Sequence, residues 1–157
     1  MVRHKMMSVE IVKMAQCHVK EIALIEKMCF TTPWSEKGIG DELSNPLALF
    51  FVALSDGVVA GYIGAHNIVG EVYITNVAVN PDFRKKGIGT ALVEHLLSVS
   101  QNEQADFVTL EVRKSNNSAI ALYEKAGFQV VGERKDFYEL PKENAILMTK
   151  FLKEQTI

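Results

Sequence analysis

Residues 74–90 read Ile74-Thr75-Asn76-Val77-Ala78-Val79-Asn80-Pro81-Asp82-Phe83-Arg84-Lys85-Lys86-Gly87-Ile88-Gly89-Thr90, and this stretch decides the fold that we expect. Its β-branched residues up to Val79 favour a strand, and Pro81 ends that strand because proline cannot donate to a sheet ladder. Apolar residues then recur at a spacing that places them on one face of a helix, at Ile88, Leu92, Leu96 and Val99. The stretch therefore predicts a strand, a short loop and a helix.

The loop between that strand and that helix has the pattern Arg84-x-x-Gly87-x-Gly89, which suits a phosphate group. The first N–H groups of a helix have no partner within the helix, and glycine lets the backbone approach a ligand closely. The helix dipole and the charges of Arg84, Lys85 and Lys86 attract an anion. The loop lacks the third glycine of a dinucleotide fingerprint and the Gly-Lys-Ser/Thr end of a Walker loop. Taken alone, it fits a basic surface turn as well as it fits a phosphate site.

Composition limits the classes of protein to consider. The 157 residues are 48% apolar and 23% charged, which is ordinary for one soluble domain with its own core. A net charge of −2 argues against a general nucleic-acid binder, and no segment has the roughly 18 apolar residues of a membrane span. The basic start at residues 1–5 precedes no apolar run, so we expect no signal peptide. Cys17 and Cys29 are expected to be reduced, packed thiols of a cytoplasmic protein.

Hydrophobic periodicity predicts the elements that precede this stretch. We expect a strand at 9–14 and a helix at 16–29. A second helix at 35–43 has Ser35 as its N-cap but is short or irregular, because Gly38 and Gly40 weaken it. Short turns join the strands at 49–54 and 58–65 to the strand that ends at Val79, which predicts an antiparallel meander, with Gly61 and Gly64 loosening its middle strand.

The same reasoning covers the second half of the chain. The nearly continuous apolar run at 107–112 predicts a central strand buried on both faces. A helix at 118–126 follows, with Asn116 or Asn117 as N-cap and Gly127 after its end. We expect a strand at 128–132, a polar loop at 134–144 and a last strand at 145–151. This order is that of a mixed α/β sheet in a single domain spanning residues 1–157.

Three motifs together resemble the GNAT family of N-acetyltransferases. They are the glycine loop after Val77-Ala78-Val79, the segment Leu110-Glu111-Val112-Arg113-Lys114-Ser115-Asn116-Asn117-Ser118-Ala119-Ile120-Ala121-Leu122-Tyr123-Glu124-Lys125-Ala126-Gly127-Phe128, and Phe30-Thr31-Thr32-Pro33-Trp34-Ser35-Glu36. The resemblance extends over residues 9–150. It implies the GNAT fold, a mixed and mostly antiparallel sheet flanked by helices, in which two splayed central strands bind acetyl-CoA as co-substrate.

The second and third motifs are most similar to bacterial members that acetylate the N-terminal alanine of a small-subunit ribosomal protein. The resemblance therefore implies a cytoplasmic acyltransferase in which the amine attacks the thioester directly. Its partner would be a protein N-terminus, with no direct contact to nucleic acid or membrane. Two alternatives stay open, a GNAT enzyme that acetylates a lysine or a small amine, and a non-catalytic acyl-CoA binding module.

Glu111 and Tyr123 are the candidate catalytic residues. A carboxylate within an apolar strand is costly to bury unless it is functional or paired, for example with Arg113. Burial also makes carboxyl groups better bases near neutrality. The resemblance assigns Glu111 as the general base and Tyr123 as the general acid that protonates the leaving thiolate, whereas a packing role is the alternative for Tyr123.

The remaining candidates are binding residues. The resemblance assigns the contacts with acetyl-CoA to Val77, Ala78, Val79, Arg84, Lys85, Lys86, Gly87, Ile88, Gly89, Thr90, Asn116 and Tyr123. Among these, the Val79 N–H is the candidate donor to the acetyl oxygen, and Asn116 fits helix capping equally well. Trp34 and Tyr138 are candidate contacts with the acceptor peptide, although Trp34 also suits the core. We assign no metal, because the four histidines, at positions 4, 18, 66 and 95, share no ligand spacing.

Overall fold

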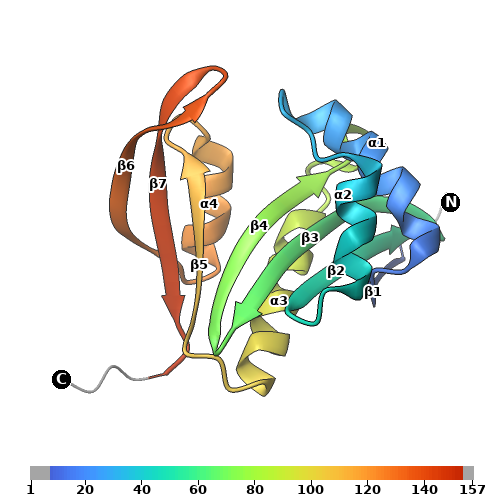
Figure 1. Ribbon diagram of the computed structural model, residues 1–157, viewed down its shortest axis with the longest axis horizontal. Coiled ribbons are helices and arrows are strands. Elements are labelled where there is room, and N and C mark those ends of the chain that lie inside the picture. Colours follow the sequence, from blue (N-terminus) through green and yellow to red (C-terminus); the bar gives the residue numbers. More distant parts are fainter. Residues whose placement is uncertain (1–7, 154–157) are drawn as a thin grey trace, which may run out of the picture.

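The computed structural model describes residues 8–153, whose elements follow the expected order (Figure 1). The strands are β1 (Val9–Lys13), β2 (Ala48–Ser55), β3 (Val58–Ile68), β4 (Glu71–Val79), β5 (Phe107–Arg113), β6 (Gln129–Glu139) and β7 (Lys142–Phe151). The helices are α1 (Val19–Cys29), α2 (Glu36–Asp41), α3 (Ile88–Asn102) and α4 (Asn117–Lys125). Three short 3-10 turns, η1 (Gln16–His18), η2 (Glu42–Ser44) and η3 (Pro81–Phe83), complete the list. The basic start of the chain and His4 lie outside the described residues.

These strands form one sheet in the order β1-β2-β3-β4-β5-β7-β6. Every neighbouring pair is antiparallel except β4 and β5, which are parallel and are joined by α3 on one face of the sheet. The meander β2-β3-β4 and the mixed, mostly antiparallel sheet are thus confirmed. Among the described residues, no helix combines the length and the apolar character that a membrane crossing requires.

Two hydrophobic cores lie on opposite faces of the sheet, because side chains alternate along each strand. In β2, Phe50 and Val52 pack with α1 and α2, whereas Phe51 and Ala53 pack with α3. Figure 1 shows α1 and α2 in front of the N-terminal half of the sheet and α3 behind it. The second half, β5 to β7, is covered by α4, whose Tyr123 joins the core shared with α3. Within the sheet, the two halves are joined by the short pairing of β4 with β5.

β4 and β5 separate soon after they meet. Residues 71–73 of β4 pair with residues 107–109 of β5, and no pairing continues beyond them (Figure 1). A bulge lies at this point, since Gly64 of β3 pairs with Asn76 and Ala65 pairs with Ile74, which leaves Thr75 as an extra residue. The Thr75 hydroxyl donates to the Gly64 carbonyl at 3.1 Å. Bulges bend the strand that carries them, so the expected splay of the two strands has a local cause.

The splay corrects the prediction that β5 is buried on both faces. Val108, Leu110 and Val112 are buried, but the residues between them are only partly buried. Two of the partly buried residues, Glu111 and Arg113, border the gap between β4 and β5. The central position that the apolar run predicts for β5 is confirmed. The second face of β5, however, is only partly buried.

The prediction of a polar loop at 134–144 is wrong. These residues belong to β6 and β7, which form a long hairpin that turns at Leu140 and Pro141. β6 is an edge strand with mostly exposed side chains, and its register against β7 shifts twice. A polar edge strand with bulges shows no regular alternation, so its sequence resembles that of a loop.

The structure also tests three smaller predictions in the first half of the chain. The second helix is short, and the Ser35 hydroxyl caps it by accepting a hydrogen bond from the Gly38 N–H at 3.0 Å, as predicted. β3 continues through Gly61 and Gly64 to Ile68, and its register against the neighbouring strands shifts next to each of these glycines. Both glycines also allow close contacts with neighbouring groups. Cys29 is part-buried, but Cys17 is exposed in η1, so the prediction that it is packed is wrong.

Candidate active site

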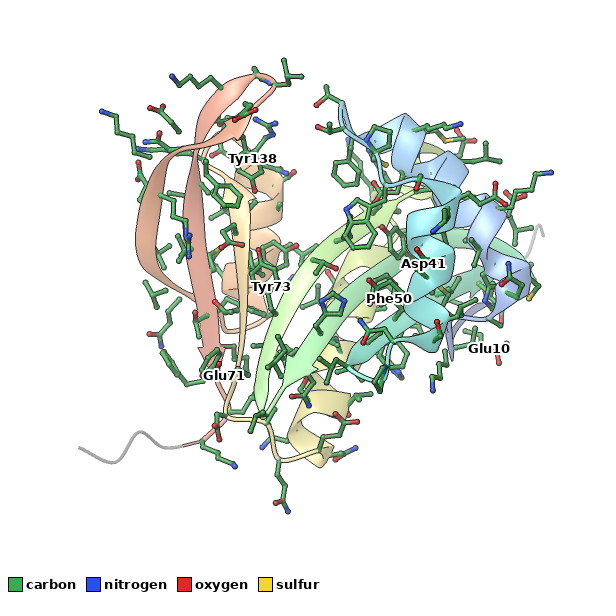
Figure 2. The ribbon with its side chains drawn as sticks, viewed as in Figure 1. Glu10, Asp41, Phe50, Glu71, Tyr73 and Tyr138 are labelled. Carbon is green, nitrogen blue, oxygen red and sulfur yellow. The ribbon has the colours of Figure 1, made fainter. Side chains whose placement is uncertain are left out.

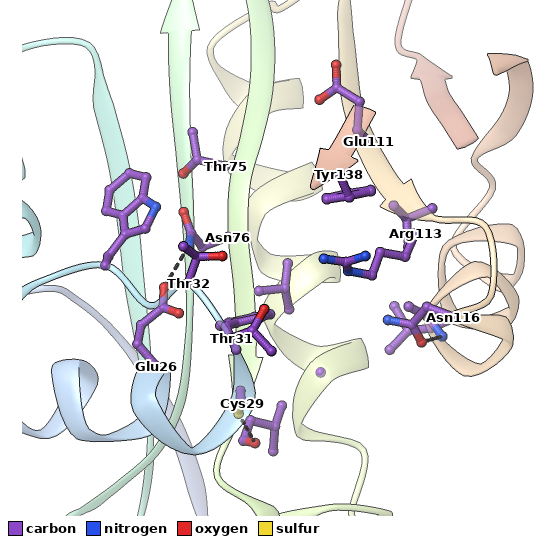
Figure 3. A pocket seen from close by; sticks show the side chains of 18 of the residues that line it. Glu26, Cys29, Thr31, Thr32, Thr75, Asn76, Glu111, Arg113, Asn116 and Tyr138 are labelled. Atoms are coloured by element: carbon purple, nitrogen blue, oxygen red, sulfur yellow. Dashed lines mark hydrogen bonds between the residues drawn. The ribbon is translucent and has the colours of Figure 1, made fainter. Parts of the chain in front are cut away.

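The gap between β4 and β5 holds a cavity of about 490 Å³, the acceptor cavity (Figure 3). One wall comes from β4 and from the segment after α1, and the other comes from β5, α4 and the end of β6. The residues that line it are Glu26, Cys29, Phe30, Thr31, Thr32, Trp34, Thr75, Asn76, Val77, Val79, Gly89, Glu111, Val112, Arg113, Asn116, Ala119, Leu122, Tyr123, Tyr138 and Pro141. The cavity therefore brings together segments that are far apart in the sequence.

A second cavity of about 600 Å³, the loop cavity, lies beside the glycine loop and the start of α4. Five residues border both cavities: Val79, Gly89, Asn116, Ala119 and Leu122. The two cavities are thus the two ends of one cleft that passes through the sheet between β4 and β5. A two-part ligand can lie in the loop cavity while its reactive end reaches the acceptor cavity.

The glycine loop has the geometry of an anion site. Gly87 is the N-cap of α3 in the left-handed conformation, with a φ of 78°, and no side chain caps the helix. The first N–H groups of α3 are therefore left for a ligand. A Cβ on Gly89 would lie 3.1 Å from the Leu122 side chain, so glycine lets α3 approach α4. Arg84 and Lys85 line the loop cavity, as do Ile88 and Thr90. These features fit a diphosphate.

One cation of the loop lies elsewhere. Lys86 lines neither cavity, and its Nζ is 5.6 Å from the centre of the Phe83 ring. Arg84 by contrast lies near α1, with Nη2 3.7 Å from the Cys29 sulfur. The structure thus brings Arg84 and Lys85, but not Lys86, to the cavity.

The open edge of β4 offers backbone groups to the cleft. Asn80 donates its N–H to the Ala60 carbonyl of β3 at 2.8 Å. Because the direction of these groups alternates along a strand, Ala78 also bonds toward β3, whereas Val77 and Val79 face the gap. In agreement, the Cys29 thiol donates to the Val79 carbonyl at 3.4 Å. Ala78 itself is buried in the core beneath α1 and lines neither cavity.

Glu111 lies in the acceptor cavity with its side chain 9% exposed. The Tyr73 hydroxyl donates to its Oε2, and Arg134 Nε lies 3.6 Å from its Oε1. The alternative pairing with Arg113 does not occur, because Arg113 pairs with Glu143. Burial and the bond to Glu111 raise the pKa of Tyr73, so this phenol stays protonated and keeps donating. Figure 2 shows Tyr73 and Tyr138 beside the gap between the two halves of the sheet.

Tyr123 lies on α4 and lines the same cavity, with its ring edge-on to Phe128 at 5.5 Å between centroids. Burial raises the pKa of Tyr123, and the nearby Tyr138 adds to this effect. The phenol is therefore protonated at neutral pH and has a proton that it can give to a leaving group. Asn116 caps α4 by accepting the Ala119 N–H at 3.2 Å, and it borders both cavities, so its two predicted roles are compatible.

The two candidate acceptor contacts face each other across the acceptor cavity. Trp34 lines one wall and also packs against Phe50, at 6.3 Å between ring centroids, so both predicted roles apply. Tyr138 lines the other wall beneath the Arg113 guanidinium, which lies 4.3 Å from its ring centre. The partly buried Tyr138 has a raised pKa, because burial and the charge of Glu111 disfavour its anion.

Sequence reasoning missed a buried polar cluster in the wall that β4 contributes. The Glu26 side chain is fully buried; its Oε1 accepts the Tyr62 hydroxyl and the Asn76 amide, the latter at 2.7 Å, and its Oε2 has no partner (Figure 3). Desolvation raises the pKa of Glu26. A signal existed, because Glu26 lies four residues after Ile22 and therefore on the buried face of α1.

The three histidines among residues 8–153 do not line this cleft. His18 Nδ1 accepts the Ala15 N–H at 2.9 Å, His66 lies 2.9 Å from Glu42, and His95 packs edge-on against Phe51. In residues 8–153, no group of three or more histidine, cysteine, aspartate or glutamate side chains is placed to hold a metal ion.

Comparison with known proteins places this geometry among acetyltransferases. Residues 19–128 match the model of the acetyltransferase (GNAT) family. The chain is 35% identical to the [ribosomal protein bS18]-alanine N-acetyltransferase of Escherichia coli K12 over 126 residues, which are 79% of this chain and 84% of that protein. It is 32% identical to the N-alpha-acetyltransferase RimI of Mycobacterium tuberculosis, over 75% of each chain. The crystal structure of the ribosomal-protein-S18-alanine N-acetyltransferase from Escherichia coli superimposes with a TM-score of 0.87 and 30% identity, over 95% of this chain and 97% of that one.

Proposed function

Because the chain belongs to the acetyltransferase (GNAT) family, we propose that it transfers an acetyl group from acetyl-CoA to the N-terminal alanine of a small-subunit ribosomal protein in the cytoplasm. One observation carries the proposal. A carboxylate, Glu111, and a protonated phenol, Tyr123, line one cleft beside the open edge of β4, in a chain whose relatives are named as bS18-alanine N-acetyltransferases.

The loop cavity supplies the binding groups for acetyl-CoA. The free N–H groups at the start of α3, with Arg84 and Lys85, would hold the diphosphate, and Val77 and Val79 would bond to the extended arm. Acetyl-CoA supplies a thioester whose carbonyl carbon accepts the amine. The Val79 N–H, at the border of the two cavities, is the donor best placed for the thioester oxygen.

Glu111 is proposed to take the proton from the attacking amine. A protein α-amine has a pKa of about 7.8 and a lysine of about 10.4, so at 1.36 kcal/mol per unit a lysine costs about 3.5 kcal/mol more to neutralise. A single carboxylate held by Tyr73 and Arg134 suffices for the α-amine. This difference favours an N-terminal acceptor over a lysine.

Tyr123 is proposed to give its proton to the leaving thiolate. The raised pKa keeps the phenol protonated at neutral pH. Tyr123 belongs to α4, the helix that begins after Asn116. No covalent acyl-enzyme is needed, because the amine and the thioester meet in the same cleft. Direct attack therefore accounts for the roles of both residues.

The test is acetyl-CoA turnover against four acceptors. They are an alanine-starting peptide from the ribosomal protein, the same peptide with a blocked N-terminus, a lysine peptide with a blocked N-terminus, and a polyamine. We expect turnover of the free N-terminus alone, and its loss in Glu111→Gln. Turnover of the lysine peptide or the polyamine would show that the acceptor is not a protein N-terminus. Binding of CoA without any turnover would indicate an acyl-CoA binding module.

A further inference from the structure

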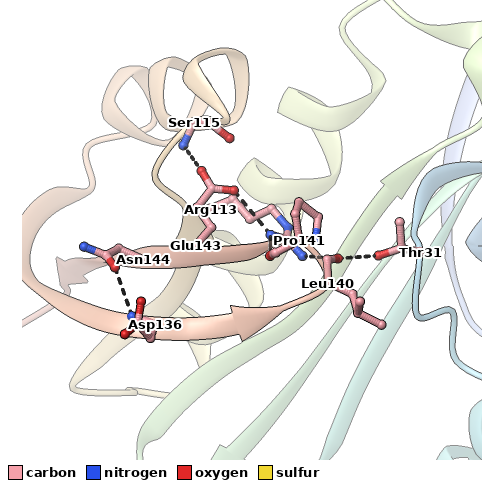
Figure 4. Close-up of polar contacts among 8 residues, drawn as sticks. All are labelled: Thr31, Arg113, Ser115, Asp136, Leu140, Pro141, Glu143 and Asn144. Atoms are coloured by element: carbon pink, nitrogen blue, oxygen red, sulfur yellow. Dashed lines mark hydrogen bonds and ion pairs between the residues drawn. The ribbon is translucent and has the colours of Figure 1, made fainter.

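Arg113 is the last residue of β5, two positions after Glu111, and its side chain holds the turn of the β6–β7 hairpin (Figure 4). Its Nη1 donates to the Pro141 carbonyl and its Nη2 to the Leu140 carbonyl, each at 2.9 Å. Nη1 also lies 3.3 Å from Glu143 Oε1. One guanidinium thus binds both carbonyls of the turn and a carboxylate of β7.

These contacts need the shape of arginine. A guanidinium is a flat fork with several fixed donors, whereas a lysine ammonium is a point charge that cannot bind two carbonyls and stack on a ring at once. The Arg113 guanidinium lies 4.3 Å from the centre of the Tyr138 ring, so it also fixes that side chain. Arg113 therefore sets the position of two parts of the acceptor cavity, Tyr138 and Pro141.

The same turn reaches across the cleft. The Leu140 carbonyl accepts a second hydrogen bond, from the Thr31 hydroxyl at 2.8 Å. Thr31 belongs to the segment after α1, which forms the opposite wall, and Figure 4 shows this contact between the two halves of the molecule. The contacts from Arg113 to Leu140 and from Leu140 to Thr31 thus join the two walls at the mouth of the acceptor cavity.

Glu143 connects this turn to the start of α4. Its Oε2 accepts the Ser115 N–H at 2.6 Å, one residue before Asn116. Hydrogen bonds from Ser115 and Arg113 lower the pKa of Glu143, which keeps the carboxylate charged. Glu143 thus links the Arg113 side chain to the backbone at the start of α4, which holds the guanidinium in place.

We propose that Arg113 is a positioning residue for the acceptor peptide: it fixes the mouth formed by Tyr138 and the Leu140–Pro141 turn, which the chain beyond the first acceptor residue must pass. This rests on the proposed function, in which the acceptor is a peptide N-terminus. Arg113 then governs the KM for a peptide long enough to reach the turn. It does not govern acetyl-CoA binding or the reaction of a single-residue acceptor.

The test compares Arg113→Lys with unmodified enzyme on an alanine-starting hexapeptide and on alaninamide. Arg113→Lys keeps the charge but loses the planar guanidinium. We expect the hexapeptide KM to rise about 10-fold, because the turn and Tyr138 lose the charged hydrogen bonds and the stacking that hold them in place. Alaninamide kcat/KM and the acetyl-CoA Kd from calorimetry should stay within about twofold. Lys114→Gln is the control, because Lys114 is the next residue and pairs on the exposed surface with Glu133.

A second variant guards against a folding defect in the first. Thr31→Val removes only the bond to Leu140 and should raise the hexapeptide KM in the same direction, by about threefold. An unchanged hexapeptide KM in both variants would overturn the proposal, as would an equal loss with alaninamide. Failure of the unmodified enzyme on every N-terminal acceptor would instead refute the proposed function itself.

Discussion

Gly61→Ala tests how tightly the fold fixes the open edge of β4. Gly61 pairs with Val79, and a Cβ at this position would lie 2.7 Å from the Ala78 carbonyl oxygen and 3.2 Å from the Val79 Cα. Both are backbone atoms, so no side-chain rotation can relieve the contact. Because non-bonded heavy atoms prefer about 3.5 Å or more, β4 would have to move away from β3 by about 0.5 Å.

The displacement should reduce both stability and activity. Overpacking of this kind costs about 1–3 kcal/mol, and for a chain of this length each kcal/mol lowers the Tm by about 2–4 °C. Val79 carries the N–H proposed to bond the thioester oxygen. A shift of 1 Å can cost about 10²-fold in rate, so half that shift should lower kcat/KM about 10-fold.

The assay combines thermal unfolding, calorimetry with acetyl-CoA and steady-state turnover. Gly132→Ala in β6 is the matched control, because a Cβ there meets no atom within 4 Å and the residue is not among the positive-φ glycines. An unchanged Tm together with an unchanged kcat/KM in Gly61→Ala would refute the claim that this contact fixes the edge of β4.

Three further predictions concern the cleft itself. Glu111→Gln and Tyr123→Phe should each lower kcat by about 10²-fold or more while acetyl-CoA still binds, and steady-state turnover of both at the unmodified rate would contradict their roles. Arg84→Ala should weaken acetyl-CoA binding about 10-fold in calorimetry through loss of a charged contact, with little change in Tm; equal affinity would argue against the diphosphate site. Glu26→Gln addresses stability: desolvation raises the pKa of Glu26 above 4.5, so the folded state binds this proton more tightly and loses stability as the pH rises through the folded pKa. The Tm of Glu26→Gln relative to the unmodified protein should therefore increase as the pH is raised above 4.5, and parallel pH profiles of the two proteins would exclude a raised pKa.

Local sequence signals predicted the elements whose chemistry is contained in a few consecutive residues. The strand and helix on either side of the glycine loop, the cap at Ser35 and the cap at Asn116 all depend on neighbours within four positions. The expected splay of β4 and β5 came from family resemblance, and the structure adds its cause, the bulge at Thr75. The assignments of Glu111 and Tyr123 remain predictions, and the structure places both in one cleft.

What the sequence did not reveal depends on pairing between distant segments. Tyr73 reaches Glu111 because β4 and β5 are parallel with Tyr73 opposite Thr109, a register that no local pattern encodes. The sequence suggests Glu111 as a partner for Arg113, whereas the hairpin brings Glu143 to it. The sequence predicts a polar loop at 134–144, where the structure has the end of β6 and the start of β7, so the contacts made by their turn cannot be predicted from it.

The splay of β4 and β5 also has a consequence for self-association. A strand with free backbone groups at the rim of a sheet is a template on which another chain can add, which is how many proteins aggregate. In this chain the backbone groups of Val77 and Val79 that face the gap lie in the interior of the sheet, opposite a wall that carries Glu111 and Tyr138. An edge that faces another wall of the same molecule is less accessible to the strand of a second chain than an outer rim, while an extended small molecule can lie along it. At this inner edge of β4, the fold thus exposes backbone hydrogen-bonding groups to a ligand rather than at an outer rim of the sheet.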